Sequence, residues 1–419
     1  MGRLYPLLEE GQNQFLLPVC NRPLLSYAIE TLLDKSGLSE IIVVTTSEKD
    51  LADVTGRVNE AAGKRFTLVT VPAGTNSVTA LLECAHLIYT DFFVVSGDLV
   101  CDISLQPMIM LHQLHDAAVT VLLSEKHEEA TGKKGQHRGL EDYIAFENQE
   151  MTTGASNPPR LLYLKERRNL GDNFYAPYRM LSKFPNFSIR ADVRDCYCYL
   201  FAPWVLDLAR AHPSFEDVKD DLLTHVLKLS WKMDPEDEKF IPKRSQHIAL
   251  SYSSSSTAFE EDDKVRCLYF STKGHTRRIR TLPVYQEVNL LVSKSQLKFN
   301  VRSVPVTHAG DARPPVGDDC FSAANVRVGE KSLVKKSVIG SHTVIGKSCK
   351  ILNSIIMDHV TIGDNVVLMS SLVSPNVFIG DKSDLTNVQV TRGMEVPADS
   401  KVSNSAYTRQ SMDSEMDVM

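Results

Sequence analysis

Apolar residues in the first half of the chain alternate between a helical spacing and short continuous runs. The helical spacing predicts helices at 22–35, 49–62 and 78–89, and the continuous runs predict strands at 41–45, 67–71 and 92–96. The last of these strands leads directly into Gly97 and Asp98. Helices placed between fully apolar strands indicate βαβ units, so we expect an α/β fold with a doubly wound, mostly parallel sheet.

The pattern becomes less regular after residue 124. Residues 125–139 are polar and rich in Lys, Gly and His, which predicts a surface loop. Further strands are predicted at 143–146, 160–164 and 196–201, and further helices at 203–211 and 222–229. Residues 251–263 contain four consecutive serines and then four acidic residues, a composition too polar to bury surface. We expect a linker there, with a domain boundary close to it.

The clearest pattern lies between residues 326 and 390, where an aliphatic residue followed by Gly recurs every six residues. Ile339-Gly340 and Ile345-Gly346 set the register. The period slips by one residue before Ile356 and becomes irregular between Leu368 and Ile379. A six-residue period predicts a left-handed parallel β-helix, with the aliphatic side chains inside and the small residue allowing the backbone to turn each corner.

Composition and charge exclude several classes of function. The chain has 46 Lys+Arg and 52 Asp+Glu, a net charge of −6, whereas a dedicated nucleic-acid binder presents a basic face. No apolar run approaches the roughly 18 residues of a membrane span, and residues 1–20 contain no signal-like apolar core. The eight cysteines lack metal-site or disulfide spacing, so we expect reduced, buried thiols and a cytosolic protein. His342 and His359 are expected at the surface.

An α/β domain followed by a hexapeptide β-helix resembles the sugar-nucleotide nucleotidyltransferases. Residues 2–7 match the end of that family's Gly-rich loop motif, and residues 16–25 (LLPVCNRPLL) match its second block closely. Amides of such a loop cradle phosphates in this family. Asp98 matches the first Mg²⁺ carboxylate, and Gly74-Thr75 match part of the base-recognition segment. The resemblance thus implies a vestigial, weak nucleotide site formed by Gly2, Arg3, Gly74, Thr75 and Asp98.

Several positions depart from the family's chemistry. The phosphate-binding Lys of the family falls at Gln14, and the Pro beside it falls at Phe15. Glutamine carries no charge to offset a triphosphate, and one carboxylate supplies too few ligands for Mg²⁺. Neither Asp192 nor Asp195 matches the motif of a second carboxylate. We therefore expect no catalytic residue, no cofactor and no metal site, with Asp98 as the sole remnant of one.

The start of the chain differs from the family as well. The family's first strand precedes the Gly-rich loop and lies inside the sheet, and Met1-Gly2-Arg3 leaves no residues for it. We expect either a chain shortened at its start or a sheet that lacks one strand and is correspondingly unstable.

Further segments resemble one branch of this family, the gamma subunits of eukaryotic translation initiation factor 2B. The resembling segments follow one another in matching order at 141–144, 160–163, 180–185, 265–269 and 285–289. The Ser-rich acidic segment also occurs in the matching place. The sequence ends soon after the repeat without the helical C-terminal domain of the catalytic epsilon subunit, which favours gamma over epsilon.

This resemblance implies a non-catalytic scaffold within the guanine-nucleotide exchange factor for initiation factor 2. Its implied partners are the epsilon subunit and the other subunits of that complex, with no membrane and no direct nucleic-acid contact. Two alternatives remain open: a sugar-phosphate nucleotidyltransferase of the mannose-1-phosphate guanylyltransferase type, and an inactive regulatory relative of it. We expect a nucleotidyltransferase-like domain over 1–235, a Ser-rich acidic linker with a bridging segment over 236–315, the β-helix over 316–405 and a polar tail over 406–419.

Overall fold

The chain forms two compact units, each assembled from separated stretches of sequence. A computed structural model describes residues 4, 7–8, 14–38, 40–46, 65–125, 142–148, 158–166, 176–242, 264–272, 274–294, 296–297, 299, 303–304, 307–308, 317 and 319–408. Unit 1 comprises Met1–Glu30, Gly97–Asp102 and Arg277–Met419, and unit 2 comprises Thr31–Ser96 and Ile103–Thr276. The predicted helix at 49–62, the loop at 126–139 and the linker at 251–263 lie outside the described residues.

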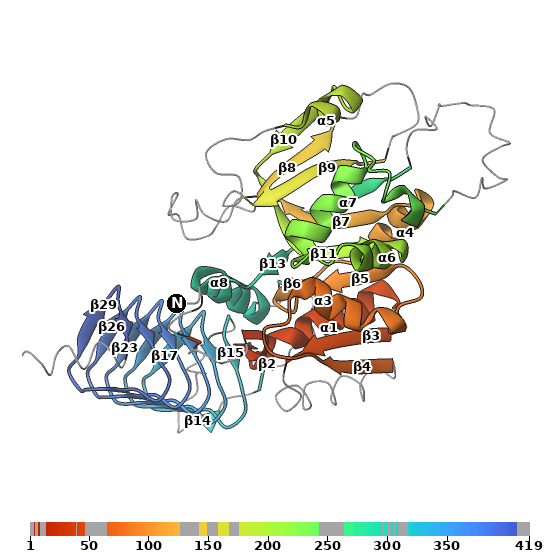
Figure 1. Ribbon diagram of the computed structural model, residues 1–419. Coiled ribbons are helices and arrows are strands. Elements are labelled where there is room, and N and C mark those ends of the chain that lie inside the picture. Colours follow the sequence, from red (N-terminus) through yellow and green to blue (C-terminus); the bar gives the residue numbers. More distant parts are fainter. Residues whose placement is uncertain are drawn as a thin grey trace, which may run out of the picture. The chain divides into compact units, whose positions relative to one another are not determined.

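A four-stranded sheet with the order β12-β7-β11-β5 lies in unit 2 (Figure 1). Its strands are β12 (Cys267–Thr272), β7 (Val119–Glu125), β11 (Val193–Phe201) and β5 (Phe92–Val95). β12 runs parallel to β7, whereas β11 runs antiparallel to both β7 and β5, so this sheet is mixed rather than mostly parallel. A separate parallel pair joins β3 (Glu40–Thr45) to β4 (Arg65–Thr70). The strands predicted at 41–45, 67–71 and 92–96 therefore form, with ends shifted by one or two residues.

Helices pack on these strands mainly through apolar side chains. They are α3 (Ser77–Glu83), α4 (Gln106–Leu114), α6 (Trp204–Ala211), the π-helix η4 (Val218–Leu223) and α7 (Thr224–Leu229), with 3₁₀ turns at Ala85–Leu87 and Glu238–Phe240. Val119, Val121 and Leu123 of β7 are fully buried in one cluster with residues of α6 and α7. The predicted helix at 78–89 thus divides into α3 and a 3₁₀ turn.

A smaller antiparallel sheet completes unit 2. It has the order β10-β8-β9, from β10 (Phe187–Arg190), β8 (Asp142–Glu147) and β9 (Leu161–Glu166), and α5 (Tyr178–Lys183) lies beside it (Figure 1). Ala145 and Leu162 pack against Met180 and Phe184 in a core of their own.

The Cys196–Cys198 segment, which the sequence pattern predicts to be a regular strand, contains an irregularity in β11. The register of β11 against β7 shifts between Asp195 and Tyr199, and Tyr197 takes a left-handed backbone with φ of 52°. The four-residue step from Asp195 to Tyr199 lies opposite the two-residue step from Leu123 to Val121, so this bulge inserts two extra residues into β11. Both cysteines are buried, as are the other six, and all eight are free thiols, as predicted.

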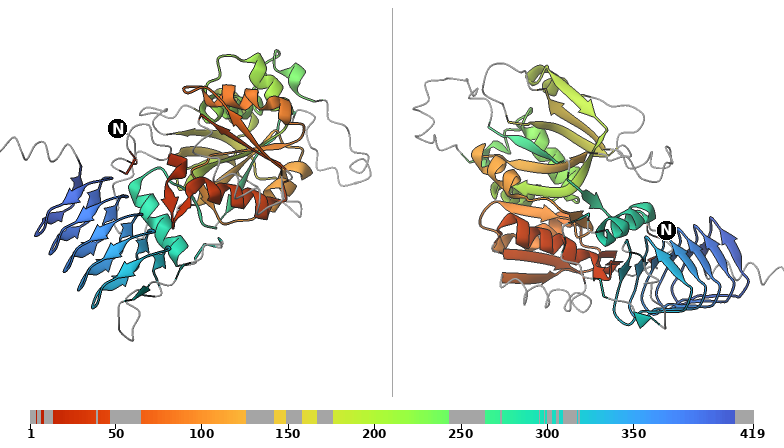
Figure 2. Two further views of the ribbon diagram at one scale, coloured as in Figure 1. Left: turned by 90° about the horizontal axis from the view of Figure 1, so that it is seen from below. Right: turned by 180° about the vertical axis from the view of Figure 1, so that it is seen from behind.

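The C-terminal repeat forms a parallel β-helix with three sheets, seen as stacked coils in Figure 2. The first sheet holds β14 (Thr307–His308), β16 (Arg327–Val328), β19 (Val344–Ile345), β22 (Thr361–Ile362), β25 (Phe378–Ile379) and β28 (Glu395–Val396). The second holds β15 (Phe321–Ser322), β18 (Val338–Ile339), β21 (Ile355–Ile356), β24 (Leu372–Val373), β27 (Gln389–Val390) and β30 (Ala406–Tyr407). The third holds β17 (Leu333–Lys335), β20 (Lys350–Leu352), β23 (Val367–Met369), β26 (Asp384–Thr386) and β29 (Lys401–Ser403). The prediction of an α/β nucleotidyltransferase-like domain followed by a parallel β-helix is confirmed.

From β15 onward each coil of the β-helix contains 17 residues, whereas β14 and β16 are paired at a separation of 20 positions. Val328 stacks on Ile345, which stacks on Ile362, and each of these pairs is separated by 17 positions. Two faces therefore take six residues each and the third takes five. This count explains the slip before Ile356, and it corrects the interpretation of residues 368–379 as irregular, because Val373 occupies the inward position there.

Glycine has a different role in the repeat from the one predicted. The corners are turned by non-glycine residues in the left-handed region, such as Asn325, His342 and His359 with φ of 57–60°. The glycines that follow the aliphatic residues instead allow one coil to lie close to the next. A Cβ atom on Gly329 would stand 2.6 Å from the carbonyl carbon of Gly346. His342 and His359 are exposed, as expected, and their rings stack with centroids 4.9 Å apart.

The remainder of unit 1 packs on one outer face of the β-helix. It contains η1 (Gln14–Leu16), the hairpin of β1 (Pro18–Val19) and β2 (Arg22–Pro23), the first part of α1 (Leu24–Ser36), the β6 (Leu99–Cys101) and β13 (Thr276–Arg278) pair, and α8 (Leu282–Ser293). Tyr285 of α8 and Val19 share a core with the outward side chains of Val338, Ile355 and Leu372. The bridging segment predicted at 236–315 is thus divided, with β12 in unit 2 and α8 in unit 1.

Residues 16–25, which resemble the second block of the nucleotidyltransferases, contain a hairpin that contacts α8 and the β-helix. Cys20 and Asn21, both with positive φ, form the two-residue turn of the hairpin. The Cys20 N–H donates to Asn289 Oδ1 at 2.9 Å, and the Asn21 side-chain amide donates to the carbonyl of Ile339 at 3.2 Å. This block therefore anchors the start of the chain to α8 and the β-helix. None of the helices among the described residues is both long enough and apolar enough to cross a bilayer.

The inward ladder of the β-helix predicts a sharp contrast between two adjacent residues. Ile345 is 2 % exposed, whereas Val344 is 41 % exposed on the same strand. We expect Ile345→Ala to lower the free energy of unfolding by about 2–5 kcal/mol, because it opens a cavity in the coil stack. Val344→Ala should change it by only about 0.5 kcal/mol. Chemical denaturation followed by circular dichroism measures both, and equal losses would contradict the assigned register.

Candidate functional site

Asp98 follows β5 in the chain and lies in unit 1, where arginines enclose it. Its carboxylate is 2 % exposed. The Arg278 guanidinium donates from Nε to Oδ1 at 2.8 Å and from Nη2 to Oδ2 at 3.0 Å, a bidentate pairing. Arg280 Nε stands 3.7 Å from Oδ2. The backbone fixes this arrangement, since the Ile279 N–H donates to the carbonyl of Asp98 at 3.0 Å, next to the β6–β13 pair.

These contacts leave the carboxylate unsuited to Mg²⁺. Both of its oxygens accept hydrogen bonds from a planar cation, in the geometry that makes Arg–carboxylate pairs strong. One carboxylate between two arginines gives the immediate surroundings a net positive charge, which repels a divalent cation. A magnesium ion would have to displace Arg278 from the carboxylate and lie beside Arg280. The residues around Asp98 therefore do not fit the metal that the family resemblance implies at this position.

The residues that replace the family's Lys-Pro pair lie in the same unit. Gln14 and Phe15 begin the 3₁₀ turn η1. A Cβ atom on Gly97 would stand 2.9 Å from Cδ1 of Phe15, so the aromatic ring packs directly on the backbone beside Asp98. An apolar ring and a neutral amide thus stand where the family has a rigid proline and a cation. Gly2 and Arg3 lie outside the described residues.

Gly74 and Thr75 form a local turn in unit 2. Gly74 has φ of +88°, and the Thr75 hydroxyl donates to the carbonyl of Pro72 at 2.8 Å. Asn76 then caps α3 by accepting from the Thr79 N–H at 2.7 Å. These contacts account for the Gly-Thr sequence as the start of a helix. Whether it also touches a nucleotide base stays a prediction.

The two other aspartates considered as metal ligands are already paired. Asp192 is exposed and accepts two hydrogen bonds from Arg190, at 2.9 and 2.7 Å. Asp195 is buried, and its Oδ2 lies 3.1 Å from the ammonium of Lys219 and accepts from the Tyr199 hydroxyl at 2.6 Å.

The buried Lys219 pairs with three carboxylates, two of which, those of Asp142 and Asp195, are buried as well. Its ammonium lies 2.9 Å from Asp142, 3.1 Å from Asp195 and 3.3 Å from Glu166. Burial acts to lower the pKa of Lys219, but the three carboxylates outweigh it and raise the pKa, so the side chain stays charged. The cluster ties β8, β9 and β11 to η4, which is a structural role.

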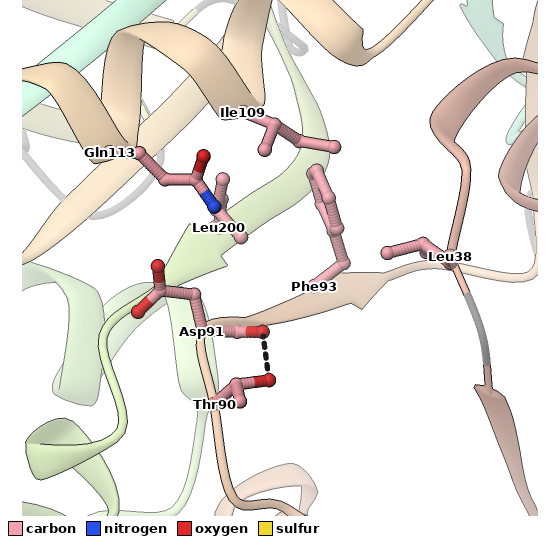
Figure 3. Close-up of a pocket in the computed structure, with 7 residues that line it drawn as sticks. All are labelled: Leu38, Thr90, Asp91, Phe93, Ile109, Gln113 and Leu200. Carbon is pink, nitrogen blue, oxygen red and sulfur yellow. Dashed lines mark hydrogen bonds between the residues drawn. The ribbon is translucent and has the colours of Figure 1, made fainter.

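A shallow hollow of about 190 Å³ opens elsewhere in unit 2 (Figure 3). Leu38, Phe93 and Ile109 supply much of its apolar lining, with Asp91 and Gln113 at its polar side. Burial, aided by the charge of Asp116, raises the pKa of Asp91. The hollow is smaller than the roughly 300–1,000 Å³ of pockets that enclose a drug-sized ligand.

Comparison with known proteins gives family matches to two parts of the chain. Residues 2–133 match the family described as Nucleotidyl transferase, and residues 316–409 match the GMPPB C-terminal domain. The gamma subunit of translation initiation factor eIF2B from Dictyostelium discoideum is 27% identical over 374 residues, covering 79% of this chain and 82% of that protein. The chain resembles eIF2B gamma subunits over most of its length. The predicted resemblance is thereby confirmed.

Two further relatives define the limits of this likeness. The eIF2B gamma subunit of Schizosaccharomyces pombe is 26% identical over 345 residues, or 79% of this chain and 71% of that protein. The mannose-1-phosphate guanylyltransferase catalytic subunit beta of Danio rerio is 27% identical over 154 residues, only 33% of this chain and 42% of that protein. Likeness to eIF2B gamma therefore extends well beyond the likeness to the transferase.

Arg278 is the residue that the sequence reasoning missed. A signal for it exists, because Arg277, Arg278 and Arg280 cluster at the end of a short strand. The sequence does not show, however, that this strand pairs with residues 180 positions earlier. Only the fold brings Arg278 to Asp98.

The Asp98–Arg278 pair predicts strong coupling between the two side chains. We expect Arg278→Met to lower the free energy of unfolding by about 3–5 kcal/mol, because it leaves a buried carboxylate without its main partner. Adding Asp98→Asn should restore much of this loss, so that the two effects are far from additive. The exposed pair of Arg210 and Asp207, 2.7 Å apart, is the control, and Arg210→Met should cost about 0–1 kcal/mol. Denaturant unfolding of Arg278→Met, Asp98→Asn, their double variant and Arg210→Met measures these effects, and additive effects of the first two changes would contradict the assigned pairing.

Proposed function

We propose that this protein is a non-catalytic scaffold subunit of the guanine-nucleotide exchange factor that acts on translation initiation factor 2. In this proposal it pairs with the epsilon subunit and contributes to GDP-to-GTP exchange in the cytosol. The observation that supports the absence of catalysis in this proposal is the pair of hydrogen bonds from Arg278 to the two carboxylate oxygens of Asp98. The part concerning the complex rests on likeness to eIF2B gamma subunits over 79% of the chain.

Loss of nucleotidyl transfer follows from charge as well as from geometry. Phosphoryl and nucleotidyl transfer need cations against the phosphates, because charge builds up on them in the transition state. Here the position of the family's Lys holds Gln14, and the metal carboxylate Asp98 is neutralised by an arginine. Gly2, Arg3, Gly74, Thr75 and Asp98 are, in this proposal, vestiges of a nucleotide site rather than a working one.

Exposed apolar side chains support an assembled state. Met110 and Leu114 lie one turn apart on α4 and are 65% and 79% exposed. Phe378 of the β-helix is 47% exposed on its sheet. Single exposed apolar residues are common, but a pair on one helix face favours association with another protein. Obligate interfaces of such complexes typically bury more than about 2,000 Å².

Two rival functions remain. The protein would be either an active sugar-phosphate nucleotidyltransferase or an inactive, regulatory relative of such an enzyme. The likeness to a mannose-1-phosphate guanylyltransferase over a third of the chain keeps that alternative in view. An active enzyme would convert GTP and mannose 1-phosphate to GDP-mannose in the presence of Mg²⁺. An inactive regulatory relative would bind GDP-mannose without turnover, which a thermal-shift titration detects.

The function of Asp98 separates these possibilities. In the assembled exchange factor, we expect Asp98→Asn to leave the rate of GDP release from initiation factor 2 within about twofold, since no catalytic step uses this carboxylate. The same preparation should form no GDP-mannose. A tenfold loss of exchange at unchanged subunit composition would contradict the vestigial role, and GDP-mannose formation that Asp98→Asn abolishes would establish the rival enzyme.

A further inference from the structure

Three metal-ligating side chains converge in unit 2, outside every segment discussed above as a nucleotide site. His212 follows the last residue of α6, His225 lies in the first turn of α7, and Asp237 immediately precedes the 3₁₀ turn at Glu238–Phe240. His212 Nε2 lies 2.7 Å from Asp237 Oδ1, and His225 Nε2 lies 2.9 Å from Asp237 Oδ2. One ligand atom from each residue lies within 4.8 Å of those of the other two.

The surrounding structure holds this group in place. Asp237 is 2 % exposed; its N–H donates to the carbonyl of Asp234 at 3.0 Å, and its carbonyl accepts from the Phe240 N–H at 3.1 Å. The Phe215 ring stacks on His212 with centroids 4.9 Å apart and lies 5.2 Å from His225. An aromatic ring thus backs both imidazoles, and the carboxylate is fixed by its own backbone. Such fixed side chains meet the first requirement of a binding site.

The donor set is one that transition metals select. Two imidazole nitrogens and one carboxylate oxygen suit Zn²⁺ and similar ions, and three protein ligands leave a fourth position for water. A tetrahedral ion at about 2.0–2.2 Å from each ligand would sit between the three atoms after small side-chain rotations. His212 and His225 are 27% and 15% exposed, so an ion can reach the group from solvent.

The charge of the group is also favourable. Burial alone would raise the pKa of Asp237, but the hydrogen bonds from His212 and His225 outweigh it and lower the pKa. The carboxylate is therefore ionised at neutral pH and ready to bind a cation. Since both Nε2 atoms face this carboxylate, a bound ion would replace the two hydrogen bonds with ligand bonds, and each imidazole would carry its proton on Nδ1.

We propose that His212, His225 and Asp237 bind one divalent transition-metal ion of the zinc type, which clamps the end of α6 to the start of α7 and to the segment before residue 238. The ion has a structural role, joining three stretches of chain that are otherwise joined by hydrogen bonds and packing. The proposal is independent of the exchange-factor function and of Asp98, and it places a metal site in unit 2, where the sequence analysis predicts none.

The test is a titration of the metal-free full-length chain with Co²⁺, whose visible absorption reports tetrahedral coordination, followed by competition with Zn²⁺. We expect one equivalent to bind and the absorption to disappear when Zn²⁺ is added. His225→Gln and Asp237→Asn should each weaken binding by about tenfold or more, because each removes a direct ligand and the loss of even an outer-shell partner costs that much. The control is His342→Gln/His359→Gln, which removes the stacked, exposed pair from the β-helix and should leave the Co²⁺ signal intact.

A second readout separates a metal site from a hydrogen-bonded triad. Zn²⁺ should raise the melting temperature of the unaltered chain, because a ligand that binds only the folded state stabilises it, and should not raise that of His225→Gln. This comparison stands even if Asp237→Asn fails to fold. Absence of Co²⁺ binding by the unaltered chain would overturn the proposal, as would a signal that persists in His225→Gln and vanishes in the His342/His359 double variant.

Discussion

The pairing of Asp98 with Arg278 is the interaction on which the functional interpretation depends. A carboxylate that is 2 % exposed must be compensated, and the nature of its partner determines what it can do. A metal ion as partner would make this position part of a transferase site. An arginine that occupies both oxygens makes it part of the framework instead, joining residues 98 and 278 across the β6–β13 pair. The same residue type in the same sequence context therefore has a different partner here.

The β-helix explains why unit 1 can take up segments from three parts of the chain. Its inward ladder closes a core of its own, while Val338, Ile355 and Leu372 point outward on one sheet and form a second apolar surface. On that surface lie α8 and the hairpin at Cys20 and Asn21. The block of sequence that most resembles the nucleotidyltransferases thus serves for packing, whereas Gln14 stands at the position of the family's phosphate-binding Lys.

Periodicity was enough to predict the β-helix and most strands of the α/β part, because buried strands and stacked coils require apolar residues at fixed intervals. It failed where the residue count changes, by one residue on a face of the β-helix and by two residues in β11. The five-residue face was mistaken for a slip, and the bulge at Tyr197 was interpreted as plain alternation. It also could not find the partner of Asp98, or join His212 to Asp237, since these contacts depend on which distant strands and helices become neighbours. The residue type and its sequence context suggested a metal ligand at Asp98, and only the fold showed that Arg278 pairs with its carboxylate.

The most direct test of the account is to identify the proteins that bind this chain in a lysate of its own cells. Affinity capture of the tagged full-length chain, with mass-spectrometric quantification, identifies them. The account predicts recovery of the other subunits of the initiation factor 2 exchange factor, with the epsilon subunit in near-equal amount. A homo-oligomer without those subunits that converts GTP and a sugar phosphate to a sugar nucleotide would contradict it.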